Sequence, residues 1–405
     1  MRVTIEPSKA RGRMEAPPSK SMAHRMLICA GCAEGTSRIE NIDLSEDVLA
    51  TMDCLKALGA GITYEDRCVT VRGTDICGIH GPALLNCREC GSTLRFMIPL
   101  CLMSGQKTEL TGSVKLFERP LCVYEKICRE QGILFERARN HLVVEGKLRS
   151  GEYELPGNVS SQFISGLLFV LPLLGGDSRI RLTGSVESRP YIDMTMQAME
   201  IFGVKARWED ESAILIRGGQ SYCPRSTKVE GDFSNAAFFE ALNLIGGDVE
   251  VTGLYDGSLQ GDKVYRQYFD RIREGYAQID LSDCPDLGPV LMAAAAMCGG
   301  AKFTGTARLR LKESDRGLAM QEELGKLGAA VEVLDNAILV EPGELRADTV
   351  LDDHNDHRIV MALAVILSAV GGSITGAEAV GKSLPDFWER FKQLGIGVRY
   401  DELDQ

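Results

Sequence analysis

The sequence predicts an α/β protein with two domains, and three observations support that fold class. A unit made of a polar helix start, an apolar helix, a glycine turn and a strand ending in Thr-Gly or its equivalent recurs about six times. The chain of 405 residues is long enough to bury two hydrophobic cores. Hydrophobic residues make up 44% and charged residues 25% of the chain, which is ordinary for a globular protein. Recurrence of one unit on this scale indicates internal duplication.

The first unit shows the pattern. Ser19 follows Pro17-Pro18 and is a good N-cap, so the apolar residues after it predict a helix. A strand at 38–41, a helix at 45–58 and a strand at 68–73 follow. The later units open their helices at Gly91–Arg95, Ser160–Gln162, Asp232–Asn235, Asp286–Pro289 and Asn355–Arg358.

The two ends of the chain predict a discontinuous second domain. The sixth unit ends near Tyr400 without a closing strand, and residues 2–7 resemble the closing strand at 338–342. We therefore expect the N-terminal strand to complete the last unit. The expected first domain is residues 20–226, and the expected second domain is residues 1–19 with 227–405.

The helix start at Lys20, Ser21 and Arg25 predicts an anion site. A helix N-terminus offers free backbone N–H groups and partial positive charge, and these side chains add two cations and a hydroxyl. A capped helix with solvated basic residues is the alternative. Basic residues recur at equivalent loop or helix-start positions, which indicates a basic cleft between the domains: Lys20, Arg25, Arg95, Arg119, Lys312, Arg316, Arg358 and Lys382.

Charge and hydropathy exclude several classes of function. The net charge of −12 argues against nucleic acid as the main partner. The longest apolar runs, 163–174 and 359–370, are too short to span a membrane. The first six residues are not a signal peptide, so we expect a cytoplasmic protein.

The 13 cysteines include two Cys-x-x-Cys pairs, Cys29/Cys32 and Cys87/Cys90. Such spacing can hold zinc. The first pair lies on the apolar part of a predicted helix, where a free thiol is an ordinary core residue. We therefore expect no metal site.

A set of motifs, in the same order along essentially the whole chain, identifies a family. The chain resembles the 5-enolpyruvylshikimate-3-phosphate (EPSP) synthases, also called 3-phosphoshikimate 1-carboxyvinyltransferases. The motifs that carry this resemblance are Pro18–Arg25, Gly91–Arg95, Glu118–Pro120, Ser160–Gln162, Arg189–Asp193, Pro285–Asp286, Lys312–Arg316, Asn355–Arg358 and Lys382–Asp386.

The resemblance implies an inside-out α/β barrel architecture, with three βαβαββ units in each of two domains. It implies transfer of the enolpyruvyl group of phosphoenolpyruvate to the 5-hydroxyl of shikimate 3-phosphate, with release of phosphate, in the biosynthesis of chorismate and aromatic amino acids. It also implies a monomer that needs no metal or organic cofactor.

The resemblance assigns roles to individual residues. Asp286 fits the base at the 5-hydroxyl and Glu313 the proton donor at the methylene carbon, with Lys20 close to the chemistry. The expected contacts of shikimate 3-phosphate are Lys20, Ser21, Arg25, Ser160, Ser161, Gln162, Ser188, Tyr191, Asp286 and Lys312. Those of phosphoenolpyruvate are Lys20, Gly91, Arg119, Gln162, Arg316, His357, Arg358 and Lys382.

The sequence departs from the family at several positions. Glu89, Ser92 and Phe96 replace the usual asparagine, threonine and proline, and Arg308 stands where some members use asparagine to touch shikimate 3-phosphate. The fourth unit is short, and a hairpin before Tyr276 looks deleted. Gly91 matches glyphosate-sensitive members, although Glu89, Ser92 and Phe96 alter its surroundings.

Two alternatives remain at this stage. The sister enzymes that transfer enolpyruvyl to UDP-N-acetylglucosamine typically carry a reactive cysteine in the loop that aligns with residues 111–120, and this chain has none there. A non-catalytic metabolite-binding protein would need only the cations, whereas this chain also keeps Asp286 and Glu313.

Overall fold

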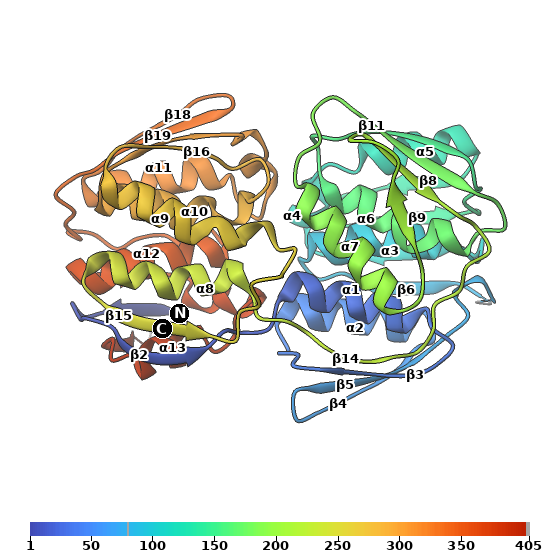
Figure 1. The fold of residues 1–405 in the computed structure, drawn as a ribbon, viewed down its shortest axis with the longest axis horizontal. Coiled ribbons are helices and arrows are strands. Elements are labelled where there is room, and N and C mark those ends of the chain that lie inside the picture. Colours follow the sequence, from blue (N-terminus) through green and yellow to red (C-terminus); the bar gives the residue numbers. More distant parts are fainter. Residues whose placement is uncertain (79–80, 402–405) are drawn as a thin grey trace. The chain divides into compact units, whose positions relative to one another are not determined.

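The computed structural model describes residues 1–78 and 81–401, which form two compact units. One unit is continuous in sequence, Pro18–Glu230. The other is discontinuous and combines Met1–Pro17 with Gly231 onward. Figure 1 traces each unit in the colours of the sequence.

Each sheet of the continuous unit follows one topology. A strand lies parallel to its neighbour at one edge, and a hairpin pairs antiparallel at the other. In spatial order, the sheets of the described residues are β14 (Ser226–Lys228), β3 (Gly35–Glu40), β5 (Cys68–Gly73) and β4 (Gly61–Glu65); β6 (Ala83–Asn86), β7 (Thr108–Thr111), β9 (His141–Glu145) and β8 (Leu134–Arg137); and β10 (Glu152–Pro156), β11 (Ser178–Thr183), β13 (Ala213–Ile216) and β12 (Ala206–Trp208).

The helices of this unit begin where the local sequence predicts. Ser19, Ser45 and Ser160 accept backbone hydrogen bonds as N-caps of α1, α2 and α6. The helices are α1 (Lys20–Gly31), α2 (Glu46–Ala57), α3 (Gly91–Cys101), α4 (Val114–Glu118), α5 (Cys122–Gln131), α6 (Ser161–Val170) and α7 (Arg189–Ile201).

In the discontinuous unit the N-terminal strand pairs with the last part of the chain, as predicted. Strand β1 (Arg2–Ile5) lies antiparallel to both β20 (Gly372–Ile374) and β21 (Val398–Asp401). A full sheet consists of β16 (Ala277–Asp280), β17 (Ala301–Thr304), β19 (Ala337–Glu341) and β18 (Ala330–Val333).

The shortened fourth unit is also confirmed. Strand β2 (Arg11–Glu15) pairs parallel with β15 (Asp248–Thr252), and among the described residues this sheet has no further strand. The chain passes from α9 (Tyr265–Glu274) directly into β16 of the next sheet. The edge that the missing hairpin would cover is therefore left to side chains and loops.

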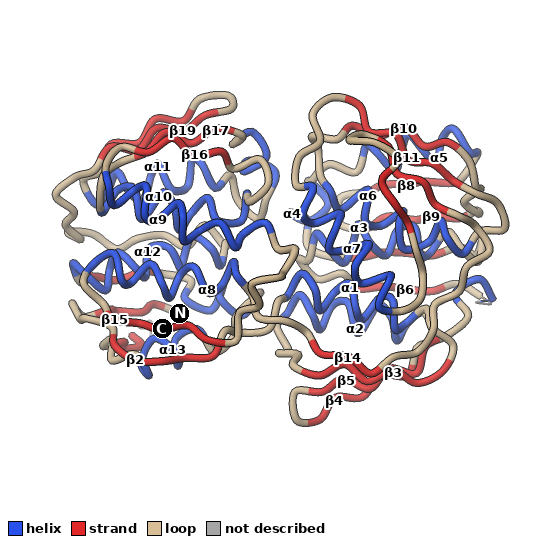
Figure 2. The backbone as a smooth tube through the Cα atoms, viewed as in Figure 1, coloured by secondary structure: helices blue, strands red, loops and turns tan. Residues whose placement is uncertain are grey.

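Helices fill the interior of each unit and strands lie around them, as Figure 2 shows within either unit. The apolar helix α10 (Gly288–Met297) is buried almost throughout, and so is α12 (His357–Val370). Alternation of buried and exposed residues along β15 and β17 shows that one face of each strand meets this helical core. The other helices are α8 (Phe233–Glu240), α11 (Arg316–Leu327) and α13 (Phe387–Gln393).

This architecture confirms the α/β class and the repeated units. The fifth unit differs in detail from the sequence prediction, because residues 285–287 form a 3-10 turn before α10 begins at Gly288. Pro289 lies at the second position of α10, where its missing N–H costs no helical hydrogen bond. No helix among the described residues has the length and apolar character needed to cross a bilayer.

Candidate active site

Lys20 lies at the first position of α1, and its ammonium pairs with a carboxylate from the next helix. Nζ of Lys20 donates to Oδ2 of Asp47 at 2.7 Å, and both side chains keep a small exposed fraction of 15% and 12%. Asp47 lies in the first turn of α2, where negative charge suits the helix dipole. The pair therefore holds a partly accessible cation at a helix N-terminus.

Arg25 is buried one turn further along α1. Its Nε donates to Oγ1 of Thr195 at 2.8 Å, and its Nη atoms donate to the carbonyls of Ser21 and Tyr191. The guanidinium lies over the rings of Phe96 and Tyr191. Burial, the largest cause, lowers the pKa of Arg25 to about 10, so the group stays charged at neutral pH. These contacts fix one cation in place between α1 and α7.

Gly91 opens α3 and lies against a guanidinium. A Cβ placed on Gly91 would come within 2.6 Å of Nη1 of Arg119, closer than real side chains approach. The absence of a side chain lets Arg119 lie over the helix start. Nη1 of Arg95 donates to Oε1 of Gln162 at 2.6 Å, and Nε2 of Gln162 donates to Ser92 at 2.8 Å.

The remaining predicted residues of this unit also lie at helix starts. Ser160 caps α6 and Ser161 is its first residue, with Gln162 next. Ser188 precedes α7 with a left-handed φ of 56° and is almost fully buried, and Tyr191 lies in the first turn of that helix. Hydroxyl and amide groups at these positions suit a polar, anionic ligand.

In the discontinuous unit Asp286 receives hydrogen bonds from three cations. Its Oδ1 accepts from Nζ of Lys312 and Nη1 of Arg316, each at 3.0 Å, and its Oδ2 accepts from Nη2 of Arg358 at 3.2 Å. Burial raises the pKa of this carboxyl, but the charges of Arg358, Lys312 and Arg316 outweigh it and bring the pKa well below the usual range. Asp286 is therefore ionised at neutral pH.

Arg316 joins the two carboxylates predicted for catalysis. Its Nη1 donates to Asp286, and its Nη2 donates to Oε2 of Glu313 at 2.7 Å. The guanidinium is 1% exposed, while the side chains of Asp286 and Glu313 are 17% and 20% exposed. Both carboxylates are thus bound to a fully buried cation and are themselves partly exposed to solvent, as groups that contact a substrate must be.

Asp356 holds Arg316 from the other side. It caps α12 by accepting from the backbone N–H of Arg358, and Oγ of Ser314 donates to its Oδ2 at 3.0 Å. His357 follows it and is buried. Lys382 lies at the end of a 3-10 turn and donates to the carbonyl and side-chain oxygens of Asn355 at 2.8 and 2.9 Å.

The structure brings the predicted site residues together in two groups. Lys20, Arg25, Gly91, Arg119 and the residues at the starts of α6 and α7 belong to the continuous unit. Asp286, Lys312, Glu313, Arg316, His357, Arg358 and Lys382 belong to the discontinuous unit.

Sequence reasoning did not assign partner roles to three carboxylates. Asp47 holds Lys20, Asp356 holds Arg316, and buried Asp262 accepts a hydrogen bond from Ser234. Burial and the negative charge of nearby Asp286 raise the pKa of Asp262 to about 6, against the opposing effects of Ser234 and Arg358. Asp47 lies at the start of the predicted helix 45–58 and Asp356 lies within the motif Asn355–Arg358, whereas Asp262 lies outside the predicted motifs.

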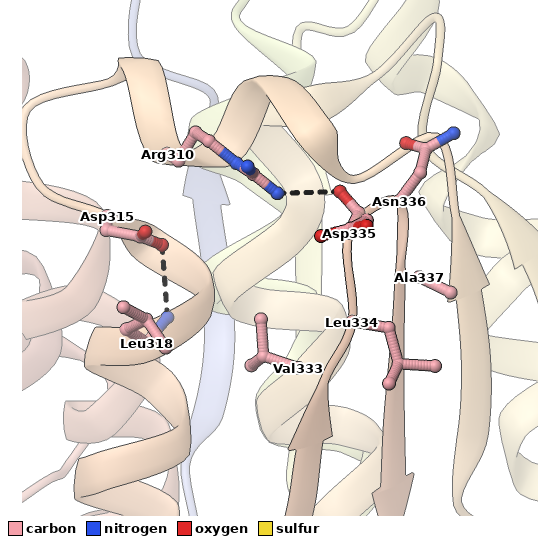
Figure 3. Close-up of a pocket in the computed structure, with 8 residues that line it drawn as sticks. All are labelled: Arg310, Asp315, Leu318, Val333, Leu334, Asp335, Asn336 and Ala337. Carbon is pink, nitrogen blue, oxygen red and sulfur yellow. Dashed lines mark hydrogen bonds between the residues drawn. The ribbon is translucent and has the colours of Figure 1, made fainter.

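A separate surface groove of about 810 Å³ lies between the start of α11 and the β18–β19 hairpin (Figure 3). Arg310 donates to the carbonyl of Asp335 there, and the side chain of Asp315 accepts from the backbone N–H of Leu318. None of the predicted site residues lines this groove. It is not the site that the motifs predict.

Comparison with known proteins agrees with the motifs. A family model described as EPSP synthase (3-phosphoshikimate 1-carboxyvinyltransferase) matches residues 5–391. A 3-phosphoshikimate 1-carboxyvinyltransferase from Clostridium perfringens strain 13 is 40% identical over 423 residues, which cover 99% of this chain and 100% of the relative. Its counterpart from Clostridium kluyveri is 40% identical and covers 97% of each chain.

Solved structures share the fold. EPSP synthase from Acinetobacter baumannii superimposes with a TM-score of 0.80 at 23% identity, covering 99% of this chain and all of that one. The enolpyruvyl transferase NikO from Streptomyces tendae reaches a TM-score of 0.77 at 14% identity, covering 98% of each chain. These likenesses show the fold, and the family model and the full-length relatives establish that the chain belongs to the EPSP synthase family.

Proposed function

We propose that the chain is a 3-phosphoshikimate 1-carboxyvinyltransferase. It transfers the enolpyruvyl group of phosphoenolpyruvate to the 5-hydroxyl of shikimate 3-phosphate and releases phosphate. The observation that carries the proposal is the Asp286–Arg316–Glu313 arrangement, two partly exposed carboxylates on one buried guanidinium. It occurs in a chain that matches named 3-phosphoshikimate 1-carboxyvinyltransferases over their whole length.

The anionic groups of the substrates account for the cations. Phosphate and carboxylate are bound best by arginine forks and by helix N-termini. In the continuous unit we assign shikimate 3-phosphate to Lys20, Ser21, Arg25, Ser160, Ser161, Gln162, Ser188 and Tyr191, and phosphoenolpyruvate to Lys20, Gly91, Arg119 and Gln162. In the discontinuous unit we assign the former to Asp286 and Lys312, and the latter to Arg316, His357, Arg358 and Lys382.

The reaction needs a base and an acid. Asp286 takes the proton of the 5-hydroxyl as the hydroxyl oxygen bonds to C2 of phosphoenolpyruvate, and Glu313 supplies a proton to the methylene carbon. Loss of a proton from that carbon then restores the double bond as the C2–O bond to phosphate breaks. Lys20 and the arginines stabilise the charge on the departing phosphate. No step calls for a metal or an organic cofactor.

The choice of acceptor is supported by one negative feature of the sequence. The segment Gly112–Pro120, which includes α4, contains no cysteine. The sister enzymes that use UDP-N-acetylglucosamine typically have one there.

We also propose a cytoplasmic monomer, with residues 20–226 and residues 1–19 plus 227–405 as its functional domains. The net charge of −12 supports the absence of a nucleic-acid partner.

A phosphate-release assay with both acceptors tests the proposal. Purified protein is mixed with phosphoenolpyruvate and either shikimate 3-phosphate or UDP-N-acetylglucosamine. We expect phosphate release in the mixture that contains shikimate 3-phosphate and none in the mixture that contains UDP-N-acetylglucosamine. Release with UDP-N-acetylglucosamine would assign the chain to the sister activity, and binding without release in either mixture would favour a metabolite-binding protein.

A further inference from the structure

Three buried side chains that the proposed reaction does not use come together at the starts of α1, α2 and α3. A ring nitrogen of His24, a carboxylate oxygen of Asp47 and Sγ of Cys90 all lie within 4.8 Å of one another. His24 and Cys90 are 1% and 2% exposed, and Asp47 is 9% exposed. We propose that these three residues form a site for a borderline divalent metal such as Zn²⁺, and that metal binding there releases Lys20 from Asp47.

The donor set suits this metal. Imidazole nitrogen, thiolate sulfur and carboxylate oxygen are the ligands that Zn²⁺ takes in proteins. Ligand atoms around a tetrahedral zinc are separated by about 3.3–3.8 Å, given Zn–N, Zn–O and Zn–S bonds of about 2.0–2.3 Å. The three atoms therefore need to approach one another by at most about 1.5 Å to close on an ion. A water molecule completes the fourth position.

The imidazole of His24 is already prepared as a ligand. Its Nδ1 lies 2.7 Å from Oγ1 of Thr51, which in turn lies 2.7 Å from Oγ1 of Thr93. Its Nε2 is buried and has no hydrogen-bond partner among the described residues. A hydrogen bond on one ring nitrogen that leaves the other available is the arrangement found around metal-bound histidines.

The thiol of Cys90 lies at a helix N-terminus. Cys90 is the N-cap of α3, and its Sγ accepts a hydrogen bond from the N–H of Thr93 at 3.3 Å. That donor and the helix dipole stabilise a thiolate. The thiol proton leaves to solvent as the metal–sulfur bond forms.

Asp47 connects this cluster to Lys20. Its Oδ2 is 2.7 Å from Nζ of Lys20, and the partly exposed ends of these two side chains are a path for an ion. A divalent ion on Asp47 replaces the ammonium as its counter-charge and repels it. Because Lys20 has a role in the proposed function, metal binding should inhibit the enzyme. Only this consequence rests on that function; metal binding itself does not.

Direct metal binding is the primary test. The full chain with exposed Cys77, Cys122 and Cys223 changed to serine serves as the parent, which removes accessible thiols that capture metal elsewhere. Zn²⁺ affinity is measured by calorimetry, and Co²⁺ is added separately to detect the near-ultraviolet absorption of a thiolate bound to cobalt. We expect one tight site with that absorption.

Matched variants locate the site. Cys90→Ser keeps a good N-cap, so α3 should still form, and His24→Asn removes the ring nitrogen. Each variant should weaken Zn²⁺ binding by at least about tenfold. Cys90→Ser should in addition abolish the cobalt–thiolate absorption. His354→Asn, in a second group with Glu322 and Glu323, is the control and should leave both signals unchanged.

Two results would overturn the proposal. One is the absence of cobalt–thiolate absorption in the parent protein. The other is an unchanged Zn²⁺ affinity in a folded Cys90→Ser or His24→Asn variant. Should both variants fail to fold, the result with the parent protein still decides. Inhibition by Zn²⁺ that is weaker in Cys90→Ser than in the parent would support the link to Lys20. Zinc binding at this site without inhibition would reject that link alone.

Discussion

Arg316 and Asp356 form a buried two-point pair, in which Nε donates to Oδ2 at 2.9 Å and Nη2 donates to Oδ1 at 3.2 Å. The two side chains are 1% and 0% exposed. Burial disfavours the charge of Asp356, yet the charge of Arg316 brings its pKa below the usual value. The planar fork of Arg316 is thereby oriented so that its remaining N–H groups meet Asp286 and Glu313.

The first prediction follows from that pair. Asp356→Asn should destabilise the protein by about 3 kcal/mol, because it leaves a buried guanidinium with less compensating charge. The change is measured as a shift of the urea unfolding transition. Asp270→Asn removes an exposed partner of Arg273 and should cost less than about 1 kcal/mol. If Asp356→Asn lowered the free energy of unfolding by no more than this control does, the buried pair would not stabilise the fold.

The second prediction concerns the proposed base. Asp286→Asn should lower turnover by roughly a hundredfold or more, the scale of general base catalysis, while shikimate 3-phosphate still binds. Turnover is measured by phosphate release and binding by calorimetry. Asp270→Asn again serves as control and should retain normal turnover. Near-normal turnover in Asp286→Asn would remove Asp286 from the role.

The third prediction is a pH dependence of stability from Asp262. The pKa of Asp262 is about 6 in the folded protein, against an ordinary value of about 3.8 in the unfolded chain, so the folded state binds more protons between these pH values. The stability contributed by this group is therefore present below about pH 3.8 and is lost as the pH rises through 6. Asp262→Asn cannot lose a proton, so its melting temperature relative to the parent should rise from pH 4 to pH 7.

Melting temperatures at pH 4, 5, 6 and 7 check this expectation. Asp248→Asn, on an exposed position of β15, should show a constant difference from the parent. A constant difference for Asp262→Asn as well would mean that the buried carboxyl titrates at its ordinary pKa.

The fourth prediction concerns Gly91 and rests on the proposed function. In Gly91→Ala the new methyl group must displace the guanidinium of Arg119, whose Nη1 would lie 2.6 Å from it. The arginine side chain is flexible, so the protein should still fold. We expect the KM for phosphoenolpyruvate to rise by about tenfold, which corresponds to about 1.4 kcal/mol of lost binding.

Glyphosate should compete with phosphoenolpyruvate in the parent and inhibit Gly91→Ala less strongly, because the longer inhibitor needs more of the space over the helix start. Inhibition is measured at several phosphoenolpyruvate concentrations in both proteins. A parent that resists millimolar glyphosate, or a variant as sensitive as the parent, would contradict the prediction.

Helix starts and strand ends were predictable from sequence because the chemistry that fixes them is local. Ser19, Ser45, Ser160, Asp232 and Asp356 each cap the helix that follows them. A capping side chain and the N–H that it serves are separated by two or three residues, so a single sequence contains both partners. The repeat added long-range information, because one unit served as a template for the others.

Contacts between helices were not predictable in the same way. The distance between Asp47 and Lys20 depends on how α1 packs against α2, and the meeting of His24 with Cys90 depends on α3 as well. The Cys-x-x-Cys spacing of Cys87 and Cys90 gave no sign of this cluster, because His24 and Asp47 lie on other helices. Local spacing does not encode which helix faces will meet.

The pairing of β1 has a consequence for synthesis on the ribosome. Thr4 of β1 donates a hydrogen bond to Asp401, 397 residues later in the chain. Strand β1 precedes the continuous unit in the chain, whereas both of its neighbours, β20 and β21, follow that unit and are made after it. Closure of that sheet therefore has to wait until the continuous unit and the strands after it have been synthesised, and such long-range strand pairing is intrinsically slow. Chaperone dependence during synthesis should therefore trace to β1 rather than to the helices of the continuous unit.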